Sequence, residues 1–288
     1  MTKQKKNWLV IHDENMYFEE DSFTIERVIE HVKDCKTRKG DIWLLDDNVL
    51  YCNNCFDLQY KEHIDLVFSD PFYDDLQIID KLVEFYPTLN GAFDVLTICN
   101  DEGMLNYIKK SKLKLQRFFI LTFTFNLPCG RQPYLRHYFM IHETVRKNKR
   151  QENYEDGFSS VLPIRYRGTL KEKRVHPHQK AVSDMERIIR HFTKEGDTIL
   201  DLFAGSGSML IAAKQTKRRC IAVEIIPEFC DIIVKRYYDY TKSSNIFLLR
   251  QAEKYKFTEI FDNFKYPYWT TFDYLERQNK IKELSQLL

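Results

Sequence analysis

The sequence predicts an α/β fold, a mostly parallel sheet with helices on both faces, and three observations support this. Strand and helix patterns alternate along most of the 288 residues. An apolar run ends at Asp201 and leads into Gly205, Gly207 and a helical pattern, the strand–turn–helix that places free backbone N–H groups beside a ligand. The next apolar strand, 220–224, ends in Glu224, seventeen residues after Gly207, where nucleotide-binding sheets carry an acid for ribose hydroxyls.

The glycine pattern limits the kind of ligand. Leu210 stands where the third glycine of a dinucleotide fingerprint would be, so a nicotinamide or flavin dinucleotide is disfavoured. A strand–helix–strand unit with an ordinary glycine turn and no ligand remains the alternative on these residues alone.

The first half of the chain is predicted from apolar runs and the turns between them. Runs at 42–45 and 49–52 flank Asp46-Asp47-Asn48, a turn composition, and a strand at 64–69 is stopped by Asp70-Pro71. Asp101 is predicted to cap a helix. The other elements expected here are a strand at 8–11, helices at 24–35, 74–85 and 101–110, and strands at 91–99, 118–125 and 138–141.

The second half begins with a polar, weakly periodic segment, 147–173, which is expected to be a loop or a small inserted module. A helix is predicted at 181–192, before the glycine-turn unit. Another helix is predicted from Pro227 to about residue 240, because proline suits a first helical turn. Residues 257–288 are expected to form an aromatic tail with a helical end.

Composition excludes several classes of protein. A hydrophobic content of 43% with 30% charged residues allows a sizeable core. Seven scattered cysteines argue against a disulfide framework and for a reducing compartment. Cys52 and Cys55 form a lone Cys-x-x-Cys, for which two half-buried thiols are favoured over zinc. The sequence shows no signal peptide and no apolar run long enough for a membrane span, so we expect a cytoplasmic or otherwise intracellular protein.

Ser69-Asp70-Pro71-Phe72-Tyr73 follows a strand, at the edge where open α/β sheets build their sites. Asp70 and the Pro71 carbonyl are acceptors, and Tyr73 offers a flat face. Two acceptors and a stacking surface suit the exocyclic amino group of a planar base, whose lone pair then attacks an electrophile. A simple Asp-Pro turn is the alternative.

In this motif and in four other stretches, the chain resembles the DNA methyltransferases that methylate adenine N6 or cytosine N4. Asp70-Pro71-Phe72-Tyr73 resembles the family's catalytic Asp/Asn/Ser-Pro-Pro-aromatic motif. The family's remaining motifs resemble the stretches 40–54, 176–180 (His-Pro-His-Gln-Lys), 201–208 (Asp-Leu-Phe-Ala-Gly-Ser-Gly-Ser) and 222–230. The catalytic motif precedes the glycine turn, as in the circularly permuted class called β.

The resemblance implies a Rossmann-like S-adenosylmethionine-dependent methyltransferase fold and S-adenosyl-L-methionine as cofactor. It implies that Asp70, Pro71, Phe72 and Tyr73 are catalytic. By the same resemblance, the cofactor-binding residues are Asp201, Phe203, Ala204, Gly205, Ser206, Gly207, Ser208, Glu224, Asn54, His178 and Lys180. The expected division is an N-terminal extension at 1–40, a catalytic domain at 41–250 with a short basic target-recognition insertion at about 143–175, and a C-terminal tail at 251–288.

The expected partner is DNA, and an acid at position 70 favours adenine N6. Cytosine N4, an RNA substrate and a catalytically impaired DNA-binding subunit of a heteromer remain alternatives. Phe72 in place of the second proline and Asn53-Asn54 in place of Gly-Asp support the last of these. His178 and Ala181 also depart from the family's Thr and Pro. A homodimer is plausible by resemblance, and no metal is needed.

The charge distribution agrees with a nucleic-acid partner. The net charge of +2 does not by itself indicate a nucleic-acid partner, but residues 131–180 hold twelve Lys/Arg against five Asp/Glu. Such a cluster binds phosphates, with a solvated loop as the alternative. The nucleic-acid-binding candidates are Arg146, Lys147, Lys149, Arg150, Arg165, Arg167, Lys171, Lys173 and Arg174. His137, His142 and Glu143 lack a third ligand at metal spacing, so strand-edge packing is favoured for them.

Overall fold

The structure is a computed structural model of the chain. It describes residues 35–71, 76–127, 135–147, 158–164, 175–176 and 179–261. The strand at 8–11 and the helix at 24–35 that the sequence predicts fall almost entirely outside these residues, as does most of the tail after residue 257.

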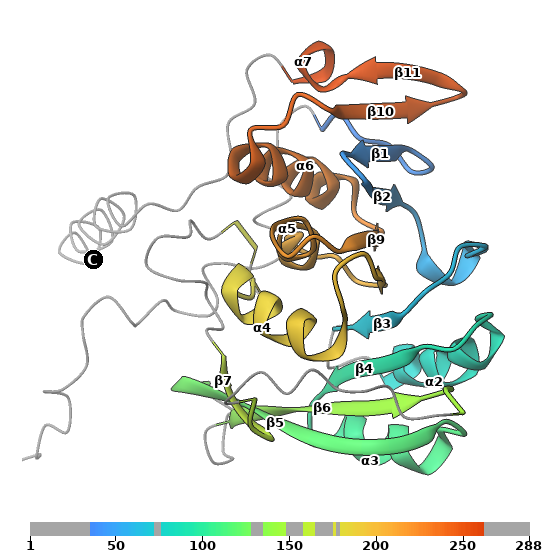
Figure 1. The fold of residues 1–288 in the computed structure, drawn as a ribbon, viewed down its shortest axis with the longest axis vertical. Coiled ribbons are helices and arrows are strands. Elements are labelled where there is room, and N and C mark those ends of the chain that lie inside the picture. The colour runs from blue at the N-terminus through green and yellow to red at the C-terminus, as the bar shows by residue number, and fades with distance from the viewer. Residues whose placement is uncertain are drawn as a thin grey trace, which may run out of the picture.

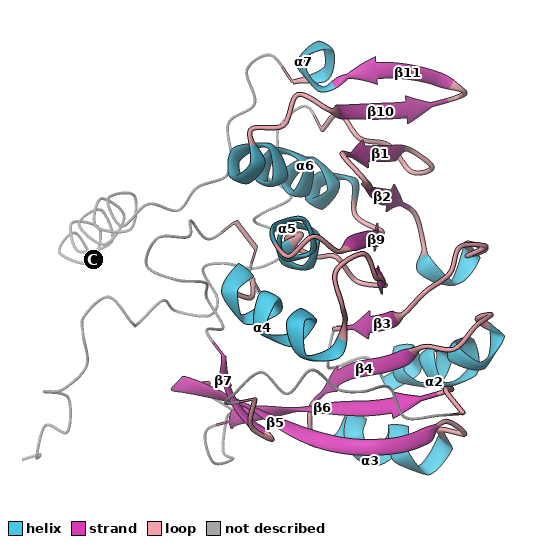
Figure 2. Ribbon diagram, in the orientation of Figure 1, coloured by secondary structure: helices cyan, strands magenta, loops and turns pink. Residues whose placement is uncertain are grey.

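One mixed sheet runs through the described part of the chain (Figures 1 and 2). Its eleven strands, counted over the described residues, have the order β11-β10-β1-β2-β9-β8-β3-β4-β6-β5-β7. The strands are β1 Ile42–Leu45, β2 Asn48–Cys52, β3 Leu66–Ser69, β4 Asp94–Cys99, β5 Lys114–Leu127, β6 Leu135–Thr144, β7 Val161–Ile164, β8 Thr198–Asp201, β9 Arg219–Glu224, β10 Ile246–Arg250 and β11 Glu253–Lys256.

The centre of the sheet is parallel. Strands β2, β9, β8, β3 and β4 pair in parallel, with Leu200 opposite Ile221 and Val67 opposite Val95. Antiparallel pairs flank this centre: β1 and β10 on one side, β6 and β5 on the other. The carboxyl ends of the five parallel strands therefore meet at one edge, as the predicted fold class requires.

Helices cover both faces of the sheet. Successive side chains of a strand point to opposite faces of the sheet and so enter different hydrophobic cores. In β3, Leu66 and Phe68 belong to one core and Val67 belongs to the other. The core with Phe68 also contains residues of α4, α5 and α6, and the core with Val67 contains residues of α2 and α3. The helices are α2 Leu76–Phe85, α3 Asp101–Lys110, α4 Val182–Phe192, α5 Ser208–Gln215, α6 Pro227–Thr241 and α7 Phe257–Ile260, with short 3-10 turns at Cys55–Asp57 and Tyr86–Thr88.

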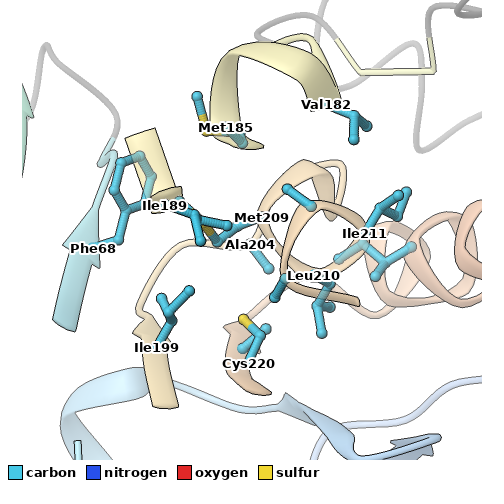
Figure 3. Close-up of a cluster of buried hydrophobic side chains, with 14 of the residues drawn as sticks. Phe68, Val182, Met185, Ile189, Ile199, Ala204, Met209, Leu210, Ile211 and Cys220 are labelled. Carbon is cyan, nitrogen blue, oxygen red and sulfur yellow. The ribbon is translucent and has the colours of Figure 1, made fainter. Parts of the chain in front are cut away.

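Helix α5 follows the glycine turn and is buried between its neighbours. Its residues Met209 to Ala213 are all buried. Figure 3 shows Ile189 of α4 beside Met209 and Ala204, with Ile199 and Cys220 rising from the strands below. An unbroken apolar run on a short helix matches this burial on several sides.

The predicted elements are confirmed in type wherever they lie within the described residues, with two differences. The N-cap of α3 is Asn100, whose side chain accepts from Gly103 N at 2.8 Å, so the prediction of Asp101 as the cap is wrong. The sequence predictions also missed β7 and the β10–β11 hairpin, although β10 carries an apolar run at 246–249 like those of the strands that were predicted. No described helix is long and apolar enough to cross a membrane.

Candidate active site

The carboxyl edge of the parallel strands gathers most of the predicted site residues that the structure describes. Asp201 ends β8, Glu224 ends β9, Asn53 and Asn54 follow β2, and Asp70 follows β3. Backbone pairing continues past the strand ends, with Leu202 N donating to Phe68 O at 3.1 Å and Ala204 N to Val223 O at 2.9 Å. The start of the glycine turn is therefore held by the strands on either side of β8.

The glycine turn depends on conformations and space that other residues lack. Gly205 has φ +54° and Gly207 has φ +76°, both in the left-handed region. A Cβ on Gly207 would lie 2.7 Å from Ile233 Cγ2 of α6. Gly207 is thus required both for its backbone angle and for the close approach of α6 to the turn.

Glu224 is tied to this turn by its carboxylate. Gly205 N donates to Oε2 at 2.8 Å and Ile226 N donates to Oε1 at 2.9 Å. The Ile225 backbone also acts on this carboxylate, so three backbone groups around the turn hold its charge. Burial raises the pKa of Glu224 to about 7, against the lowering effect of these backbone donors.

Asp201 is a second buried acid close by. Its Oδ1 accepts from Phe203 N at 3.2 Å, which shapes the start of the turn. Burial raises the pKa of Asp201 to about 7, and the negative charges of Asp70 and Glu224 add to the rise, while the Lys180 ammonium opposes it. The edge therefore concentrates three acids that repel one another.

Arg236 is a site residue that the sequence analysis missed. It lies on α6, is buried, and its Nη1 donates to Ser206 O at 2.8 Å, Ser206 Oγ at 3.1 Å and Ser208 Oγ at 2.9 Å. The one sequence signal is its spacing, since Arg236 stands three residues after Ile233, on the face of α6 that packs against the turn. An arginine on an apolar helix face indicates a buried acceptor.

Asp70 and Lys180 form an ion pair at the centre of the edge. Lys180 Nζ donates to Asp70 Oδ2, and the two side chains are 4% and 16% exposed. Below them, Tyr86 OH donates to Ser69 Oγ at 2.8 Å and lies 2.9 Å from Thr97 Oγ1, which joins β3 to β4 under the acid. Pro71 is buried, and Phe72 and Tyr73 lie outside the described residues.

A family model described as DNA methylase matches residues 12–235, more than three quarters of the chain. The chain belongs to the N6/N4 DNA methylase family. Shorter stretches resemble type II methyltransferases: 61 residues are 48% identical to M2.DpnII of Streptococcus pneumoniae, and 78 residues are 38% identical to M.HindIII of Haemophilus influenzae. These stretches cover 21% and 27% of this chain, and only 23% and 25% of those relatives.

Solved methyltransferases share the fold of this family member. The M1.HpyAVI–SAM complex superimposes with a TM-score of 0.55 at 23% identity, covering 65% of this chain and 98% of that one. The cytosine-N4-specific PvuII DNA methyltransferase superimposes with a TM-score of 0.51 at 16% identity, covering 67% of this chain and 90% of that one. At these identities the likeness shows a common α/β architecture.

Two residues near this edge, Asn54 and Ile225, affect the cofactor site that the family motifs predict. Asn54, which stands where the family usually has an acid, accepts from Phe56 N at 3.1 Å and caps the 3-10 turn Cys55–Asp57. The Asn54 Oδ1 atom therefore already accepts a hydrogen bond from the backbone of this turn. Ile225, which the sequence analysis did not select, is 57% exposed and presents an apolar side chain directly after Glu224.

The structure does not bring the basic candidates to this edge where it describes them. Arg146 Nε donates to Asp94 Oδ2 at 2.9 Å and Nη2 to Asp65 O at 2.9 Å, at the amino ends of β4 and β3. That is the opposite edge of the sheet from the glycine turn, and binding of nucleic acid by Arg146 stays a prediction. Lys147 is exposed beside it. The candidates Lys149, Arg150, Arg165, Arg167, Lys171, Lys173 and Arg174, and His178 of the cofactor set, lie outside the described residues.

The histidines and the acid of β6 form polar contacts with side chains of neighbouring elements. His142 Nε2 lies 3.3 Å from Asp94 Oδ1, and Tyr107 OH donates to Glu143 Oε2 at 2.5 Å. His137 Nε2 lies 3.4 Å from Asp101 Oδ1. Among the residues that the structure describes, no group of three or more His, Cys, Asp and Glu side chains could hold a metal ion.

Proposed function

We propose that the chain is an S-adenosylmethionine-dependent DNA methyltransferase whose acceptor is adenine N6. The observation that carries the proposal is that Asp70, the acid of the motif expected to be catalytic, lies at the same sheet edge as the glycine turn and Glu224. Membership of the N6/N4 DNA methylase family supports the reaction class.

The cofactor side of the proposal rests on Glu224 and its neighbours. A carboxylate at the end of β9, beside the glycine turn, suits the hydroxyls of a ribose. Ile225 supplies apolar area for the adenine ring, and the turn at 203–208 receives the methionine end. M1.HpyAVI and TTHA0409 of Thermus thermophilus, which share the fold, have been solved as complexes with S-adenosylmethionine.

The acceptor side uses the Asp70 carboxylate and the Pro71 carbonyl as acceptors for the two amino hydrogens of a flipped-out adenine. These acceptors increase the electron density on nitrogen. Its lone pair attacks the methyl carbon in line, the N–C bond forms, and the C–S electron pair returns to sulfur. The nitrogen then loses one proton to Asp70 or water. By the family resemblance, Phe72 and Tyr73 stack on the base.

The choice of adenine rests on Asp70 alone. The cytosine-N4 members of the family usually carry Ser at this position, and here it is an acid. Cytosine N4 is therefore the second candidate, and a nucleoside analysis of the product separates the two.

Asp70→Ala tests the proposal. The purified chain is incubated with labelled S-adenosylmethionine and duplex DNA, single-stranded DNA or RNA, and the digested product is analysed by mass spectrometry. We expect N6-methyladenine in duplex DNA. The variant should lose at least about a thousandfold in turnover, since it removes the main acceptor for the reacting group. Cofactor affinity should stay within about threefold.

Asp47→Ala is the matched control, because Asp47 is exposed in the turn between β1 and β2, away from the acids of the site. Its turnover should equal that of the parent chain. Undiminished methylation by Asp70→Ala would overturn the assigned role, and methylation confined to RNA or to cytosine would overturn the assigned substrate.

A further inference from the structure

Lys180 was expected to bind the cofactor, but its ammonium contacts the acid assigned to the acceptor. Lys180 Nζ donates to Asp70 Oδ2 across 110 residues of chain. Both side chains are withdrawn from solvent, at 4% and 16% exposure. A buried pair of this kind holds both partners in one geometry, because breaking it leaves an uncompensated charge.

The backbone of Lys180 is fixed to the cofactor turn. Ser208 Oγ donates to the Lys180 carbonyl at 2.6 Å, and Arg236 Nη1 donates to Ser208 Oγ at 2.9 Å. Ser208 is also the first residue of α5. A continuous set of contacts therefore runs from the first turn of α5 through the Lys180 backbone and side chain to Asp70.

A second acid lies near this pair. Asp201 is close enough for both charges to act on it, the Asp70 carboxylate raising its pKa and the Lys180 ammonium lowering it.

From this arrangement, and resting on the proposed function, we propose that Lys180 is a positioning residue for methyl transfer. Its ammonium holds the Asp70 carboxylate beside the cofactor turn until the acceptor amino group replaces it. Lys180 then acts through Asp70 and contributes little to cofactor affinity.

Lys180→Met tests the inference, with Lys180→Arg as the conservative variant that keeps the cation. In Lys180→Met, kcat should fall by about ten- to a hundredfold, because a displaced reacting group of this kind costs up to about a hundredfold. The dissociation constant of S-adenosylmethionine, measured by calorimetry, should change less than about threefold. Lys180→Arg should recover part of kcat.

A double-mutant cycle distinguishes positioning from a general structural role. In an Asp70→Asn background, single-turnover methylation should fall no further when Lys180→Met is added, because the lysine acts only through that carboxylate. The thermal midpoint of Lys180→Met should fall, and the double variant should recover most of that loss because the buried charge is gone.

The outcomes that overturn the inference are separate from those that overturn the function. An unchanged kcat in Lys180→Met, a raised cofactor dissociation constant with normal kcat, or additive losses in the cycle each overturn the role of Lys180 alone. A parent chain that methylates no DNA overturns the proposed function and this inference together.

Discussion

The predicted cofactor side of the site is fixed mainly by backbone hydrogen bonds, whereas the acid of the predicted acceptor side pairs with a side chain from a distant segment. Glu224 receives the N–H of Gly205, 19 residues away, and the turn pairs through its own backbone with β3 and β9. Asp70 pairs with the ammonium of Lys180, 110 residues away in the chain.

This difference shows what fixes the geometry of each half of the site. Backbone donors and strand pairing leave the cofactor turn few alternatives, because every amide of a buried turn requires a partner. A carboxylate held by a flexible lysine can exchange that partner for another donor. In the proposed function, the cofactor half is thus a fixed receptor, and the acceptor half can release its acid to a substrate.

The largest effect that would sharpen this comparison is expected from Gly207→Ala. The new Cβ would meet Ile233 and would also force an unfavourable φ, so the free energy of unfolding should fall by about 3–5 kcal/mol. Cofactor affinity should fall at least about tenfold, because 1.4 kcal/mol of lost binding free energy corresponds to that factor.

Gly196→Ala is the matched control for Gly207→Ala. Gly196 has φ +85°, but a Cβ there meets nothing within 4 Å. Chemical denaturation should show a loss of only about 1–2 kcal/mol from the backbone angle. Equal losses in the two variants would mean that contact with α6 does not constrain the turn.

Arg236→Met should give the next largest effect. It leaves the Ser206 and Ser208 oxygens without their guanidinium donor, which should cost about 2–3 kcal/mol of unfolding free energy and weaken cofactor binding. Lys217→Met, whose side chain is 76% exposed and pairs with Glu195 at the surface, is the control and should cost under about 1 kcal/mol. Intact cofactor affinity in Arg236→Met would show that the turn is rigid without α6.

Arg146→Ala tests whether the basic cluster belongs to the acceptor half. Removing its bonds to Asp94 and Asp65 should lower the unfolding free energy by about 1–3 kcal/mol. DNA affinity and its salt dependence should not change, because Arg146 lies at the opposite edge. Lys147→Ala, beside it and exposed, should leave stability unchanged. A salt slope reduced by about 1 in Arg146→Ala would place DNA at that edge.

The smallest effect concerns pH and the two buried acids. Because burial raises the pKa of Asp201 and Glu224 to about 7, both are partly protonated near neutrality in the free protein. If ribose hydroxyls require the ionised Glu224, cofactor affinity should fall about tenfold from pH 8 to pH 6, since one pKa unit is about 1.4 kcal/mol. Calorimetry in buffers of different ionisation enthalpy should detect proton release on binding at pH 6.

The stability of the cofactor-free fold should change in the opposite sense. Raised pKa values mean that the fold binds more protons than the unfolded chain. The stabilising contribution is fully present below about pH 4 and is lost as pH rises through about 7. Glu224→Gln should reduce this dependence in thermal unfolding, and an unchanged pH profile would contradict the raised pKa of Glu224.

By itself, the sequence determined the local units of this protein. Apolar runs, turn residues and the pair Gly205 and Gly207 predicted the central strands, the glycine turn and the acid that ends β9, because these features depend on neighbours within about twenty residues. The Asp-Pro motif after β3 and the motif order also predicted the family, which the match over residues 12–235 establishes.

Only the tertiary structure decided which side chains share the site. Sheet order placed Asp70 beside Lys180, packing of α6 put the Arg236 guanidinium under the turn, and the same sheet carried Arg146 to the far edge. The hairpin partner β11 is a charged strand with no apolar pattern, and it is held in the sheet by pairing with β10, which pairs in turn with β1. Such contacts join residues far apart in the chain, and their geometry follows from the pairing of strands and the packing of helices, which local periodicity does not encode.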